Sequence, residues 1–103
     1  MKLIAIEEHF LTADIRAAWD SSAIGQEGTA EFDRGEIGER LNDLGQGRIA
    51  LMDESGVDVQ VLSVTTPALL NLEPEQSVIL ARRTNDMVAA TINCSRAPTM
   101  HLW

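Results

Sequence analysis

The chain has 103 residues, 45% of them hydrophobic, and a formal net charge of −8 at neutral pH, which is typical of one small folded domain. Lysine and arginine together number only eight, so no basic surface predicts binding to nucleic acid. The longest uncharged stretch, residues 59–72, is too short and too polar to cross a bilayer, and the N-terminus lacks a signal-peptide pattern. These features favour a cytoplasmic protein, and the lone Cys94 excludes a disulfide framework.

The first predicted element is a β-strand over residues 2–9. Residues 3–6 form an uninterrupted apolar run, which is typical of a strand covered on both faces in a parallel sheet. Residues 11–35 are rich in glycine and acidic residues. We expect a long loop there, with one helical turn at about residues 13–19.

A single helix is predicted over residues 36–55. Its apolar positions recur at helical spacing, and Gly56 follows as a C-terminal stop signal. Gly45 and Gly47 weaken the helix by up to ~1 kcal/mol each relative to alanine, so we expect a kink or a close contact there. The predicted apolar face comprises Ile37, Leu41, Leu44, Leu51 and Met52.

A second strand is predicted over residues 57–64, which are rich in β-branched side chains. A helix is predicted from Pro74, a residue common in first helical turns, to Asn93. Its apolar stripe includes the polar Asn85, which we expect to be a buried amide bonded to a neighbouring loop. Strands that alternate with helices predict an α/β fold with a parallel sheet. The stripe itself is formed by Val78, Ala81, Val88 and Ile92.

Three ionisable residues, Glu7, Glu8 and His9, end the first strand. Because side chains alternate along a strand, we expect Glu7 and His9 on one face, and Glu8 on the other, toward the helices. A carboxylate and an imidazole on one face can bind a common zinc, manganese or iron ion. The carboxyl ends of parallel strands are also where α/β folds place their active sites. The alternative is that His9 is a hydrogen-bonded surface residue.

Three segments together carry a resemblance to a known family. They are IAIEEHF (residues 4–10), RIALMDESGVDVQVLSVTTPAL (48–69) and ARRTNDMVAATI (81–92). In order and spacing they resemble the amidohydrolase superfamily, in the branch that includes gamma-resorcylate decarboxylase and aminocarboxymuconate semialdehyde decarboxylase. The resemblance covers residues 1 to about 93.

The resemblance implies a metal-dependent (β/α)8 barrel that decarboxylates a hydroxylated aromatic or related carboxylic acid without oxidation. It places the metal pair of the first strand on Glu7 and His9, with zinc or manganese as the expected ion. Many hydrolases of the superfamily have two histidines at this place, so the glutamate favours decarboxylation, and a metal-dependent hydrolase is the alternative. The expected partner is a small carboxylic acid.

The loop after the second strand is the implied substrate-binding segment, because the matching segment of relatives lines the substrate pocket. The alternative is an ordinary turn that ends the strand. Phe10 and Trp19 could also line the pocket, but we expect them to serve packing. The implied substrate-binding residues are Thr65, Thr66, Pro67 and Ala68.

A complete barrel of this kind takes roughly 250 residues. The resemblance therefore implies only the first β/α units of a TIM-type barrel, truncated after about two strands and two helices. The family's other metal ligands are a histidine from the middle of the barrel and an aspartate that also acts as acid/base, and neither has a counterpart here. We expect residues 1–93 to be the N-terminal part of such an enzyme, inactive alone, followed by a divergent tail over residues 94–103.

A second hypothesis is a non-catalytic α/β module that binds a protein partner through its acidic surface or its open sheet edge. Two β/α units bury little apolar surface in either case. We therefore expect low stability, relieved by homo-oligomer formation at the open edges.

Overall fold

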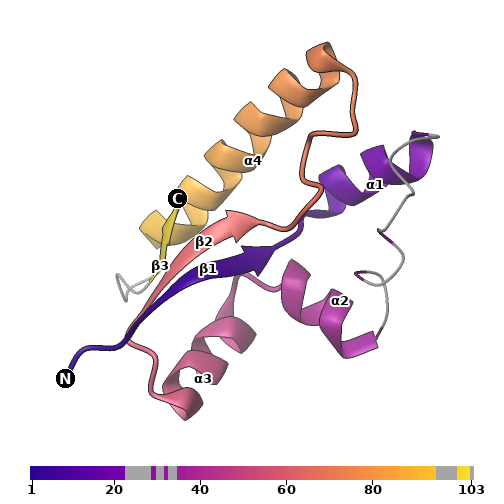
Figure 1. Cartoon of the computed structure of the whole chain (residues 1–103). Helices are drawn as coiled ribbons and strands as arrows, with labels where there is room; N and C mark the ends of the chain where they lie inside the picture. Colours follow the sequence, from indigo (N-terminus) through magenta and orange to yellow (C-terminus); the bar gives the residue numbers. More distant parts are fainter. Residues whose placement is uncertain (23–28, 30–31, 33–34, 95–99, 103) are drawn as a thin grey trace.

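The computed structural model describes residues 1–22, 29, 32, 35–94 and 100–102. Figure 1 shows a small sheet with helices arranged along it. The elements in chain order are β1 (Ile4–Phe10), α1 (Ala13–Ser21), α2 (Gly35–Asn42), α3 (Gln46–Ser55), β2 (Val59–Val64), α4 (Pro74–Cys94) and β3 (Met100–Leu102).

The sheet has the strand order β1-β2-β3, and both neighbouring pairs are parallel. The predicted α/β class with a parallel sheet is therefore confirmed. The sequence does not predict β3, in which residues 100–102 of the tail pair with β2. The described residues form three strands and four helices, where the sequence predicts two of each. Residues 95–99 and 103 of the tail lie outside the described residues.

Helices α3 and α4 cover the same face of the sheet. Met52 of α3 and Val88 of α4 pack with Phe10 of β1 and Leu62 of β2 in one buried cluster. A second buried cluster joins α1 to the start of α4. The core thus lies between the helices and one face of the strands.

The apolar run that opens β1 is exposed. Ile4 is 54% exposed and Ile6 is 65% exposed, whereas Phe10 at the end of the same strand is fully buried. The expectation that this strand is covered on both faces is wrong, because the described helices cover only the face that carries Phe10. Within the described ranges, no helix combines the length and apolar character needed to span a membrane.

The first helix, α1, is a nine-residue helix where the sequence predicts one turn in a loop. Thr12 caps it, since its hydroxyl accepts the Ile15 N–H at 3.2 Å. Trp19 is 1% exposed, and its indole Nε1 donates to the Ala68 carbonyl at 2.8 Å. Trp19 therefore joins α1 to the loop after β2, and the packing role expected for Trp19 and Phe10 is confirmed. Residues 23–28, 30–31 and 33–34 of the predicted loop lie outside the described residues.

The single helix predicted over residues 36–55 is two helices, α2 and α3. Asp43 lies at the break, where its carboxylate accepts the Gly45 N–H at 2.8 Å. A Cβ at Gly47 would lie 2.0 Å from the other Asp43 oxygen, so the close contact expected at these glycines is confirmed. Gly56, with φ of 74°, ends α3 as predicted.

Two predicted helix faces are only partly right. Ile37 and Leu51 are exposed while Met52 is buried, because the break prevents residues 36–55 from sharing one face. On α4, Thr84 lies in the core and Asn85 is exposed, so the role expected for Asn85 as a buried amide is wrong. The buried residues of α4 are spaced four apart, at Leu80, Thr84 and Val88.

Replacing Trp19 with phenylalanine (W19F) is expected to lower the free energy of unfolding by about 1–3 kcal/mol, because the Ala68 carbonyl loses its donor. Urea denaturation followed by circular dichroism measures the change. The control is V78A, since Val78 is 53% exposed on α4 and its truncation should have little effect. Equal midpoints for W19F and the unaltered chain would contradict a stabilising link through Trp19.

Candidate functional site

Strand β1 is irregular where its ionisable residues begin. Its register against β2 shifts by one between Ala5 and Glu8, so Ile6 and Glu7 together occupy the place opposite Val61. This is the geometry of a β-bulge, which redirects side chains and is frequent beside active sites. Glu7 has φ of 58°, a left-handed conformation that is uncommon for any residue other than glycine.

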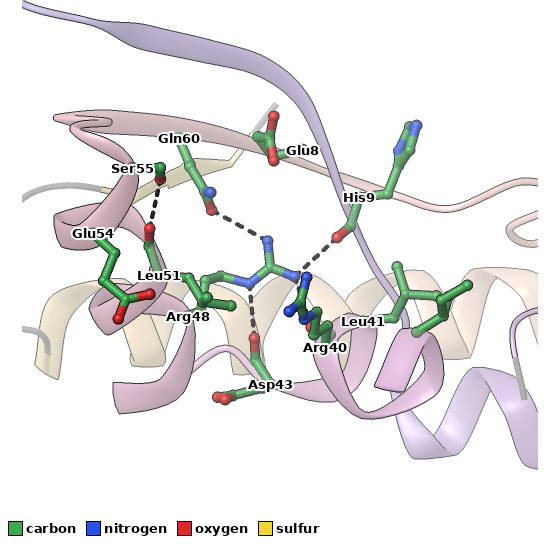
Figure 2. A pocket seen from close by; sticks show the side chains of 11 residues that line it. Glu8, His9, Arg40, Leu41, Asp43, Arg48, Leu51, Glu54, Ser55 and Gln60 are labelled. Carbon is green, nitrogen blue, oxygen red and sulfur yellow. Dashed lines mark hydrogen bonds between the residues drawn. The ribbon is translucent and has the colours of Figure 1, made fainter. Parts of the chain in front are cut away.

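The bulge changes which face of β1 the side chains of Glu7, Glu8 and His9 are expected to occupy. Strict alternation, which places Glu7 and His9 together, requires a regular strand and does not hold across a bulge. Glu8 lies toward the helices as predicted, in a pocket that it shares with Arg48 and Gln60 (Figure 2). Glu7 and His9 are exposed near the carboxyl end of β1, and their role as metal ligands stays a prediction.

The ring of His9 is paired with a hydroxyl of the neighbouring strand. His9 Nδ1 lies 3.1 Å from Ser63 Oγ, and the two residues are opposite each other in the register of β1 and β2. When Nδ1 donates this hydrogen bond, Nε2 is left unprotonated and can bind a metal. Ser63 could not be found from the sequence, because strand register depends on tertiary pairing.

The predicted substrate loop begins beside the end of β1. The Thr65 N–H donates to the Phe10 carbonyl at 2.9 Å, and Thr65 is only 4% exposed. Thr66 is exposed, while Pro67 and Ala68 are half-buried. The loop and the end of β1 thus meet at the same edge of the sheet, the edge where α/β proteins place their active sites.

A pocket of about 560 Å³ lies between the sheet and helices α2 and α3. Arg48 of α3 extends into it (Figure 2) and is 9% exposed. Every guanidinium nitrogen has an acceptor, and within the described ranges no buried side-chain nitrogen or oxygen lacks a partner. Nε donates to the Asp43 carbonyl at 2.7 Å, Nη1 to Gln60 Oε1 at 3.2 Å, and Nη2 to the carbonyls of His9 at 2.9 Å and Arg40 at 3.1 Å.

Burial lowers the pKa of the Arg48 guanidinium, and the nearby carboxylates of Glu8 and Asp43 act in the opposite direction. The group stays charged at neutral pH, because arginine titrates far above it. The sequence signal for Arg48 is a charged residue four positions before Met52, on the buried side of α3.

The variants E7G and E7A both remove the carboxylate but differ in backbone freedom. E7G is expected to be more stable than E7A by about 1 kcal/mol, because glycine adopts positive φ without a Cβ clash. Urea denaturation of both variants gives the difference. The control pair is E8G and E8A, where glycine should be the less stable variant, as it is elsewhere in strands. If the alanine variant is the more stable one in both pairs, the left-handed conformation of Glu7 is contradicted.

No family model matches the chain. Among curated proteins, the chain is 33% identical over 97 residues to gamma-resorcylate decarboxylase of Polaromonas sp. (strain JS666 / ATCC BAA-500). The match covers 93% of this chain and 27% of that protein. The chain therefore spans little more than a quarter of the length of this curated relative.

Two solved structures share the fold. The 5-carboxyvanillate decarboxylase of Novosphingobium aromaticivorans DSM 12444, complexed with manganese and 4-hydroxy-3-methoxy-5-nitrobenzoic acid, has a TM-score of 0.82 and 28% identity, covering 98% of this chain and 32% of that one. The dihydroxybenzoic acid decarboxylase of Polaromonas sp. JS666, with bound manganese and the inhibitor 2-nitroresorcinol, has a TM-score of 0.76 and 31% identity, covering 100% of this chain and 30% of that one. Over nearly all of its own length, the chain is similar to a part of these manganese-bound decarboxylases.

Proposed function

We propose that the chain is part of a divalent-metal-dependent decarboxylase that removes the carboxyl group of a hydroxylated aromatic acid. The observation that carries the proposal is the likeness of its fold, over 98% of the chain, to a manganese-bound 5-carboxyvanillate decarboxylase. The three segments that resemble the amidohydrolase superfamily support assignment to that superfamily. Decarboxylation is favoured over hydrolysis because the relative and the two structures are all named decarboxylases.

The first β/α units of a barrel account for the uneven covering of the sheet. In such a barrel, helices cover the outer face of the strands and side chains of other strands fill the inside. Here the helices cover the face with Phe10 and Leu62, while Ile4 and Ile6 are exposed. In the proposed whole enzyme, further strands of the barrel would cover Ile4 and Ile6.

Glu7 and His9 are the proposed metal ligands, and their donor atoms suit the ion. Carboxylate oxygen and imidazole nitrogen bind both manganese and zinc, and Ser63 is placed to accept from Nδ1 and leave Nε2 for the metal. The described part of the chain contains no group of three or more metal-binding side chains, so other ligands would come from elsewhere in the enzyme. A bound divalent cation supplies positive charge that attracts a carboxylate and stabilises negative charge.

Residues 65–68 are proposed to line the substrate pocket. Their backbone is held at both ends, by the Phe10 carbonyl at Thr65 and by the Trp19 indole at Ala68. A loop held in this way keeps a fixed position relative to β1, which favours orientation of a bound substrate. The acid that would protonate the ring carbon is not assigned to any residue of this chain, so we expect no decarboxylation by the chain alone.

Manganese binding to the purified chain tests the proposed ligands. The electron paramagnetic resonance signal of free Mn²⁺ should fall as chain is added. The variants H9A and E7Q should each weaken binding by about tenfold or more, because H9A removes one ligand and E7Q removes the negative charge of the other. Even changes behind the ligands commonly weaken binding by this amount.

The matched control is E8Q, which makes the same charge change at the neighbouring residue that faces the helices. E8Q should leave the affinity for Mn²⁺ unchanged. If E8Q weakens binding as much as E7Q does, the ion is held by the acidic surface in general, and the proposed ligand pair is wrong.

A further inference from the structure

We propose that Arg48 is a positioning residue that fixes the orientation of His9 for metal binding; this rests on the function proposed above. Arg48 is turned toward the main chain of His9, and the His9 ring points away from it (Figure 2). It acts on the main chain of the ligand, since Nη2 donates to the His9 carbonyl at 2.9 Å.

The guanidinium is itself held in place, which is what a positioning group requires. Its Nε donates to the Asp43 carbonyl, and its Nη1 donates to Gln60 Oε1 on β2. The nitrogen that reaches His9 also reaches the Arg40 carbonyl at the end of α2. Because the fork is planar and rigid, fixing it at three other acceptors fixes the direction of its bond to His9.

The His9 main chain lies just after an interruption of the regular strand pairing. Glu7, two residues earlier, has positive φ in a β-bulge, and a bulge locally disrupts the regular ladder of backbone hydrogen bonds. The bond from Arg48 adds a fixed donor just after this interruption. Ser63 Oγ then contacts the ring, so the backbone and the imidazole of His9 are each oriented by a separate group.

Measurement of Mn²⁺ affinity in R48K separates positioning from general stability. Lysine keeps the positive charge, so the electrostatic effect of residue 48 on the ion changes little. It lacks the rigid planar fork that fixes the direction of the hydrogen bonds. We expect R48K to bind Mn²⁺ about tenfold more weakly than the unaltered chain, the lower end of the range seen when groups behind metal ligands are changed.

Each protein is titrated with Mn²⁺ in the presence and in the absence of trimethylamine N-oxide, which favours the folded state. The concentration of trimethylamine N-oxide is chosen so that circular dichroism shows the same folded fraction for every variant. The control variant is M52V, since Met52 is buried one turn along α3 from Arg48 and packs in the hydrophobic cluster with Phe10. M52V should lower the urea midpoint and, at equal folded fraction, bind Mn²⁺ as the unaltered chain does.

The ligand variant H9A distinguishes the two proposals. Loss of binding in H9A together with weak binding in R48K that trimethylamine N-oxide does not restore supports the positioning role. Loss in H9A with normal or fully restored binding in R48K overturns the positioning role and leaves the metal site standing. Unchanged binding in H9A overturns the proposed metal site, and the role of Arg48 with it.

Discussion

The guanidinium of Arg48 ties together four separate segments of the described structure. It is a charged group with N–H donors in a fixed planar arrangement, and burying it without acceptors would be strongly unfavourable. The acceptors come from the end of α2, the turn at Asp43, β1 and β2. Movement of any one of these segments would leave a buried donor unpaired, so the break between α2 and α3 and the pairing of the two strands depend on each other.

The two non-glycine residues with positive φ in the described ranges are Glu7 and Ala68. Both lie in segments that we propose to face the metal and the substrate. Unfavourable backbone conformations persist only where the surroundings hold them. The Trp19 indole holds the Ala68 carbonyl, and the Arg48 guanidinium holds the His9 carbonyl beyond Glu7. The proposed site is therefore supported by side chains from α1 and α3, one behind each segment.

The elements that the sequence predicts well are those set by local patterns. Strand β2 lies within the predicted residues 57–64, and α4 begins at Pro74 and ends one residue beyond the predicted Asn93. Local chemistry also identifies Gly47 as a point of close contact. The features missed are tertiary: β3 exists through pairing with β2, and the bulge at Glu7 exists through register against β2.

The candidate site likewise combines residues that local sequence patterns predict with residues that only tertiary contacts bring together. Its ionisable residues and its loop can be read from the sequence, because the former end a predicted strand and the latter follows one directly. Ser63 cannot, because it acts through strand register. The spacing of Arg48 four positions before Met52 marks its burial on α3, but not its hydrogen bond to His9. The fold brings the groups that orient a ligand to that ligand, and sequence spacing does not show which residue they contact.

The exposed Ile4 and Ile6 have a consequence for the behaviour of many copies of the chain together. With a net charge of −8, copies of the chain repel one another in dilute buffer, and this repulsion keeps their exposed apolar surfaces apart. Added electrolyte shortens the range of the repulsion to about 3 Å at 1 M, while sulfate strengthens the burial of apolar surface. Salting-out with ammonium sulfate should therefore precipitate this chain at a lower concentration than its acidic composition alone suggests.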